Sequence, residues 1–212
     1  MSDSARGKLP LMWSMNPNLS HRVPQCFEYM YDNLTANDYM AAGEGAGYLI
    51  PSGLSSAQTL SYTGIKRPSG NANAMSKWAA YNKEFYQSLD MNITGFIING
   101  SNSLTAEIAD CYNQFNTVGA FHGDSYKQFY SHNGVPYVHV TSAGDAANIY
   151  NKTTGYSSKF GCFRTVSWSP TEIKTLVDNT QAYFSARGKT SQYLDPYTFF
   201  AYAKQSGRLT AF

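Results

Sequence analysis

The chain has 212 residues, of which 42% are hydrophobic, 15% aromatic and only 14% charged, and its formal net charge is +2. Because an average soluble domain carries about 25% charged residues, the surface must consist largely of Ser, Thr, Asn, Gly and Tyr. The Lys and Arg residues are scattered and form no basic stripe, which argues against nucleic acid as a partner. No segment approaches the roughly 18 apolar residues of a membrane span.

Short apolar strands alternate with longer amphipathic helices along the chain. We predict strands at residues 9–15, 38–43, 93–100, 117–123, 135–142 and 160–168. We predict helices at residues 23–34, 71–89, 103–115, 124–134, 145–153, 169–187 and 195–207. Ser103 and Ser169 are the expected N-caps of their helices, and Pro170 suits the first helical position.

This alternation predicts an α/β fold in which a parallel sheet is covered by helices. About six strands are too few for a complete eight-stranded barrel, so we expect a partial or small (β/α) barrel-like domain or an open doubly wound sheet. No repeat or linker divides residues 1–212, which we interpret as a single domain. An incomplete barrel would expose a sheet edge, through which the chain could form a homo-oligomer.

Polar and aromatic residues follow the strands, where parallel α/β folds bind ligands. Acids, amides and aromatic rings on one rim suit a carbohydrate, because carboxylates handle protons, amides bond hydroxyls and rings stack on sugars. Structural roles remain open as alternatives: the acids could cap helices, the histidine could be structural, and the tryptophans could be packed in the core. The rim residues are Trp13, Asn16, Glu44, Tyr48, Asn99, His122, Asp124, Thr141, Asp145, Ser167 and Trp168.

The stretch GEGAGYLIP (residues 43–51) reads as a strand end that runs into a tight glycine loop. It lacks the Lys-Ser/Thr ending of a phosphate-binding loop and no helix follows at once, so we expect no nucleotide cofactor. Cys26, Cys111 and Cys162 lie far apart without metal-ligand spacing. We therefore expect buried free thiols, with one disulfide as the alternative, and no metal site.

Five N-x-S/T sequons begin at Asn18, Asn33, Asn92, Asn99 and Asn151. In a secreted protein they would be candidate glycosylation sites. The N-terminal residues MSDSARGK lack the apolar core of a signal peptide. The composition nevertheless suggests an extracellular or cell-surface protein, and we interpret the chain as a fragment or a processed form.

Residues 45–51, GAGYLIP, resemble the signature of the GxGYxYP family, whose members are assigned as glycoside hydrolases. LPLMWSMNPNLSHRVP, VPYVHV, CFRTVSWSP and DPYTFFAYAKQ resemble that family's C-terminal domain in the same order. The resemblance implies a barrel-like fold and action on glycans. Two departures stand out: Ile50 replaces the second tyrosine, and only Ser2-Asp3 matches an aspartate-rich strand end of the form SDGDN.

Two hypotheses follow. In the first, the chain is a glycoside hydrolase in which Glu44 is the acid or base, Asp124 or Asp3 is its partner, and Trp13, Asn16, Tyr48, Asn99, His122 and Trp168 hold the sugar. In the second, it is a non-catalytic extracellular glycoprotein that binds glycan or self-assembles. A nucleotide-binding module ranks well behind both.

Overall fold

The structure of the chain is a computed structural model that describes residues 2–55, 73–100, 103–123 and 129–211. Its strands are β1 (Leu11–Met15), β2 (Asp38–Ala42), β3 (Ile93–Ile97), β4 (Gly119–His122), β5 (Phe129–His132), β6 (Val135–Ser142), β7 (Cys162–Arg164) and β8 (Thr210–Ala211). Its helices are α1 (Leu19–Arg22), α2 (Pro24–Asp32), the 3₁₀ turn η1 (Pro51–Leu54), α3 (Ala74–Ser88), α4 (Ala106–Tyr112), α5 (Ala146–Gly155), α6 (Pro170–Ser185) and α7 (Pro196–Gln205).

One mostly parallel sheet organises the fold, in the order β1-β2-β3-β4-β6-β5-β8. The N-terminal half of β6 pairs with β5 in antiparallel register, and its last three residues pair with β7 in parallel register. The strands β1, β2, β3, β4, β6 and β7 therefore form a parallel series of six. Among the described residues, β1 and β7 do not pair with each other, so the series stays open.

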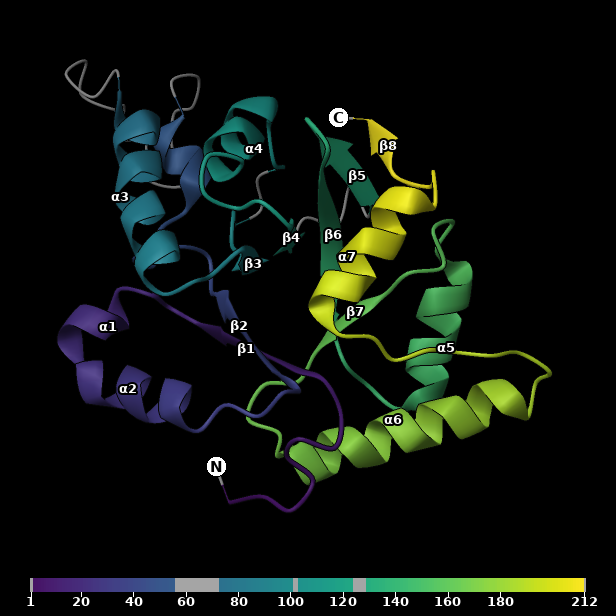
Figure 1. Cartoon of the computed structure of the whole chain (residues 1–212). Coiled ribbons are helices and arrows are strands. Elements are labelled where there is room, and N and C mark those ends of the chain that lie inside the picture. Colours follow the sequence, from purple (N-terminus) through teal and green to yellow (C-terminus); the bar gives the residue numbers. More distant parts are fainter. Residues whose placement is uncertain (1, 56–72, 101–102, 124–128, 212) are drawn as a thin grey trace.

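Helices cover both faces of the sheet, α1 to α4 on one side and α5 to α7 on the other (Figure 1). The strand alternation places successive residues in different cores: Ala120 and Tyr137 face α3 and α4, whereas Phe121 and Val138 face α7. Phe200 of α7 packs so closely on Gly119 that a Cβ there would overlap its ring. The predicted α/β class with a parallel sheet and alternating helices is confirmed.

The helix predicted at residues 124–134 is wrong where the structure describes it. Phe129–His132 is strand β5, and a two-residue turn joins it to β6. Asn133 and Gly134 have φ values of 50° and 79°, as a type I′ hairpin turn requires. The Asn-Gly pair was the available signal, and the apolar spacing around it favoured a helix only by coincidence.

The predicted helix caps are half right. Ser169 forms a reciprocal capping box with Glu172 at the start of α6, which confirms that prediction. Thr105, and not Ser103, caps α4, because its hydroxyl accepts the Ile108 amide.

Candidate functional site

The glycine loop after β2 holds Glu44 in an uncommon backbone conformation. Gly43 donates its amide to the carbonyl of Met15 at the end of β1 (2.7 Å), and Gly45 donates to the carbonyl of Gly43 (2.7 Å). Glu44 has φ 62°, a region that non-glycine residues enter at a cost of about 1–3 kcal/mol. The neighbouring chain must therefore hold this turn in place.

Asn82 of α3 holds the glycine loop in place through two hydrogen bonds. Its Oδ1 accepts the Ala46 amide at 2.5 Å, and its Nδ2 donates to the Trp78 carbonyl at 2.8 Å. Gly45, with φ 129°, leaves the room for this contact, since a Cβ there would lie 2.5 Å from the same Oδ1. Asn82 was not among the residues predicted for this site, although its place one turn after Trp78 puts it on the buried stripe of the helix.

Two further side chains tie the loop to the rest of the domain. Asn16 Oδ1, at the end of β1, accepts the amides of Gly47 (3.1 Å) and Asn18 (3.0 Å). Tyr112 of α4 donates its hydroxyl to the Glu44 carbonyl (2.7 Å). Asn16 therefore reaches the predicted rim, where it binds the protein's own backbone.

The Glu44 side chain is only 2% exposed, and neither carboxyl oxygen has a hydrogen-bond partner of good geometry among the described residues. Burial raises the pKa of this carboxyl to about 8, and the backbone amides of Ile98 and Leu49 oppose the rise only weakly. The group is therefore protonated at neutral pH. A neutral carboxylic acid at a strand end can donate a proton, as a general acid must.

Asn99, which follows β3, and His122, the last residue of β4, are both buried. Asn99 accepts the Ser52 amide (2.9 Å) and donates to the Ser103 carbonyl (3.0 Å). His122 is fully buried, and burial together with His139 lowers its pKa to about 3. His122 is therefore neutral at physiological pH, in accordance with a structural histidine.

Tyr48, by contrast, is 81% exposed and free to meet a ligand.

Of the two predicted carboxylate partners of Glu44, the structure describes Asp3 alone, and it places Asp3 away from Glu44. Asp3 accepts the Ala5 amide (2.8 Å) and the Thr171 hydroxyl (2.8 Å), so it lies next to the start of α6. Figure 1 shows that segment away from the end of β2. Asp124 lies outside the described residues. Asp145 caps α5 through the Asn148 amide (2.8 Å), the duller of its two predicted roles.

The two predicted tryptophans differ in their surroundings. Trp13 packs against the core beneath α3 and α4, and its indole N–H donates to Asp38 (2.7 Å). That ring is held as a structural element. Trp168 is 38% exposed and lines a large cavity on the other face of the sheet.

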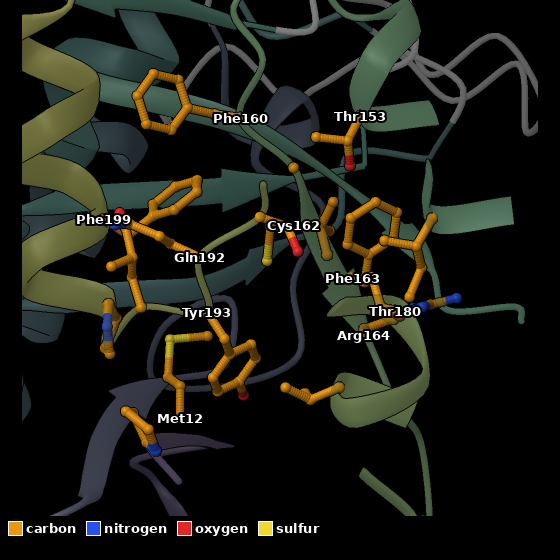
Figure 2. A pocket seen from close by; sticks show the side chains of 18 of the residues that line it. Met12, Thr153, Phe160, Cys162, Phe163, Arg164, Thr180, Gln192, Tyr193 and Phe199 are labelled. Carbon is orange, nitrogen blue, oxygen red and sulfur yellow. The ribbon is translucent and has the colours of Figure 1, made fainter. Parts of the chain in front are cut away.

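This cavity has a volume of about 1490 Å³ and opens between β1 and β7. Its walls come from the inner sheet face, α6, α7 and residues 188–194. Figure 2 shows Met12, Cys162, Gln192 and Tyr193 gathered around it. Ser14 also lines the cavity, and its hydroxyl lies 3.2 Å from where a Cβ on Gly43 would sit. Ser14 therefore lies beside Gly43, although neither Gly43 nor Glu44 lines the cavity.

The cysteines and acids form no metal site in the described part of the chain. Cys111 is buried as expected, Cys162 is half-buried, and Cys26 is exposed, which corrects the expectation of three buried thiols. No group of three or more His, Cys, Asp or Glu side chains among the described residues could hold a metal ion. None of the described helices has the length and apolar character of a membrane span.

The sequon asparagines are not equally accessible. Asn33 and Asn151 are exposed, Asn18 and Asn92 are partly exposed, and Asn99 is buried with its amide nitrogen bonded inside the protein. A glycan on Asn99 is incompatible with this fold.

Comparisons with known proteins agree with this architecture. A search among curated proteins found no match. A solved structure described as a "putative hydrolase" from Bacteroides thetaiotaomicron VPI-5482 superimposes with a TM-score of 0.69 at 17% sequence identity, over 97% of this chain and 41% of that one. The likeness supports the fold, and the chain spans less than half the length of that protein. The model of the "GxGYxYP putative glycoside hydrolase C-terminal domain" matches residues 1–160, three quarters of the chain. The chain belongs to the GxGYxYP family.

Proposed function

We propose that the chain is a glycoside hydrolase-like domain that acts on a glycan, with Glu44 as the proton donor. One observation carries the proposal: a buried carboxyl without a well-placed partner, with a pKa of about 8, lies at the carboxyl end of β2, directly before the family signature. Such a group costs folding free energy. Costs of this kind are typical of functional sites.

The chemistry of this step follows from the protonation state. In a glycoside hydrolase the neutral acid protonates the leaving oxygen, and a second, ionised carboxylate attacks the sugar or activates water. No other carboxylate among the described residues contributes to the pKa of Glu44. Asp124, which follows β4, is the partner that we propose.

Glu44→Gln tests the proposal, because it keeps the shape of the side chain and removes the proton. On a panel of chromogenic glycosides, we expect turnover to fall by about 10²–10⁴-fold. Glu84→Gln, an exposed substitution on α3, is the matched control and should keep full turnover. Equal turnover by both variants, with intact folding by circular dichroism, would exclude Glu44 as the acid.

A second function fits the same fold: an extracellular glycoprotein that binds glycan without cleaving it, or that self-assembles through the outer edge of β1. Two observations favour it, namely the lack of a described carboxylate beside Glu44 and the exposure of Asn33 and Asn151. The intact mass of the natively sourced chain tests it. Added mass in hexose steps that disappears in the Asn33→Gln and Asn151→Gln variants would support secretion. A bare mass of 23.5 kDa would argue against glycosylation.

A further inference from the structure

The described charged side chains that line the cavity between β1 and β7 are all cations. Three cations line it, Lys159, Arg164 and Lys189, and none of the described lining residues is Asp or Glu. In a chain with 16 basic and 14 acidic residues, a concave surface with cations alone is a local imbalance. Cavity walls of low dielectric strengthen the attraction of such a site for anions.

Arg164 is the cation best placed to bind a ligand. It lies on β7, and its guanidinium carbon sits 4.9 Å from the centroid of the Phe96 ring, which fixes its position. Its Nε makes one long contact with Ser142 Oγ (3.5 Å). Its two terminal nitrogens have no protein acceptor in the described part of the chain, and no carboxylate pairs with it there. Two parallel N–H donors thus remain for an oxyanion.

The other two cations are committed to different degrees. Lys159 donates to the Thr154 carbonyl (2.5 Å). Lys189 lies with its ammonium 5.4 Å from the Tyr150 ring centroid, and no ion pair is described for it. Lys189 can therefore join Arg164 in binding an anion, whereas Lys159 already uses one of its N–H donors in its backbone contact.

The rest of the lining suits sugar rings. Phe163, Trp168 and Tyr193 supply aromatic rings, and Gln192 supplies an amide; Figure 2 shows Phe163, Gln192 and Tyr193. Aromatic faces stack on the apolar side of a pyranose, while amides bond its hydroxyls. At about 1490 Å³ the cavity exceeds the roughly 300–1,000 Å³ of a site for one small ligand, so it has room for several rings.

We infer that this cavity binds an oligosaccharide that carries carboxylate or sulfate groups, with Arg164 as the principal contact to the anion. The inference deepens the proposed function, on which the choice of a glycan rests. Because the described lining holds no acid, the cavity itself binds and orients the chain of sugars. Any cleavage belongs to Glu44, which does not line the cavity and follows Gly43, the neighbour of the lining residue Ser14.

Isothermal titration calorimetry with a matched pair of ligands tests the inference. α-1,4-Trigalacturonate and α-1,4-galactotriose differ only in having a carboxylate or a hydroxymethyl group at C6. We expect the acidic trisaccharide to bind at least about tenfold more tightly, as one charge-assisted contact predicts. Its affinity should weaken as salt rises from 50 to 300 mM, because salt screens the attraction. A sulfated galactan oligosaccharide, measured in parallel, tells whether sulfate serves as well as carboxylate.

Arg164→Met removes the charge and keeps most of the apolar stem. Arg187→Met is its control, because Arg187 is also exposed and stacks on an aromatic ring, Tyr183 at 3.4 Å, but does not line the cavity. We expect the first variant to lose the preference for the acidic trisaccharide and the second to keep it. Equal binding of the two trisaccharides, no binding of any acidic ligand, or equal losses in both variants would each overturn the inference.

The two proposals fail separately. Glu44→Gln should leave binding of the acidic trisaccharide unchanged. If Arg164-dependent binding is found but no glycan is cleaved, the cavity inference stands and the hydrolase proposal falls. If Glu44-dependent cleavage is found on neutral glycans alone and acidic glycans do not bind, the reverse holds.

Discussion

Glu44 and His122 should shape the dependence of stability on pH in opposite directions. Burial raises the pKa of Glu44 from 4.5 to about 8 and lowers that of His122 from 6.5 to about 3. Between pH 4.5 and 8 the folded chain keeps a proton on Glu44 that the unfolded chain has lost, so the free energy of unfolding falls as pH rises. Between pH 3 and 6.5 the unfolded chain holds a proton on His122 that the folded chain lacks, so the free energy of unfolding rises with pH.

Each effect amounts to about 1.4 kcal/mol per pH unit. The two effects cancel between pH 4.5 and 6.5, where we expect a plateau. Above pH 6.5 only the Glu44 effect remains, so the free energy of unfolding should fall by up to about 2 kcal/mol by pH 8. Cys111 and Cys162, with pKa values raised from 9 to about 12, alter stability only above about pH 9.

Urea unfolding at half-unit steps from pH 4 to 9 measures this curve. In Glu44→Gln the fall between pH 6.5 and 8 should disappear, and stability should instead rise up to pH 6.5 and then stay level. Glu84→Gln should reproduce the wild-type curve. A fall above pH 6.5 that persists in Glu44→Gln would refute the conclusion that burial keeps this carboxyl protonated.

Two further predictions concern the scaffold, and urea unfolding measures both. Gly45→Ala should lower the free energy of unfolding by about 2–5 kcal/mol, because it strains the backbone and displaces Asn82. Gly47→Ala should lower it by only about 1–3 kcal/mol, because Gly47 has φ 104° but open space around it, so the backbone strain is the sole cost. Equal losses in the two variants would show that the Asn82 contact is unimportant. Asp38→Asn should lower the free energy of unfolding by about 3–5 kcal/mol, because it breaks the buried ion pair between Asp38 and Arg6. Asp178→Asn breaks the exposed pair with Lys174, so it should lower the free energy of unfolding by under about 0.5 kcal/mol. A similar cost for the two aspartates would contradict the role given to burial.

The parallel part of the fold could be predicted from sequence because most of its strands are largely apolar runs that an amphipathic helix follows. Ile93–Ile97 and Val135–Ser142 were recognisable in this way. Strand β5 was missed because Phe129 and Tyr130 also suit a helical stripe, and only the turn residues distinguish the two. Strand β8 has two residues, too few for any periodicity.

The candidate site was predictable at its centre and not at its periphery. Glu44 and Asn16 follow strand ends, so the rule for parallel sheets places them on one rim. The cavity could not be predicted from this rule, because Gln192 and Tyr193 lie in an irregular segment between α6 and α7 whose path the sequence does not reveal. The lack of acids around Arg164 is likewise a property of tertiary packing.

The packing of Phe200 on Gly119 bears on how the domain can be produced for experiments. The family match ends at residue 160, yet Phe200 fills the second core together with Phe121 and Val138. A recombinant fragment cut at residue 160 would leave that apolar sheet face open to water and prone to aggregation. The stretch that sequence comparison identifies is therefore shorter than the unit that folds, and expression should extend at least through α7.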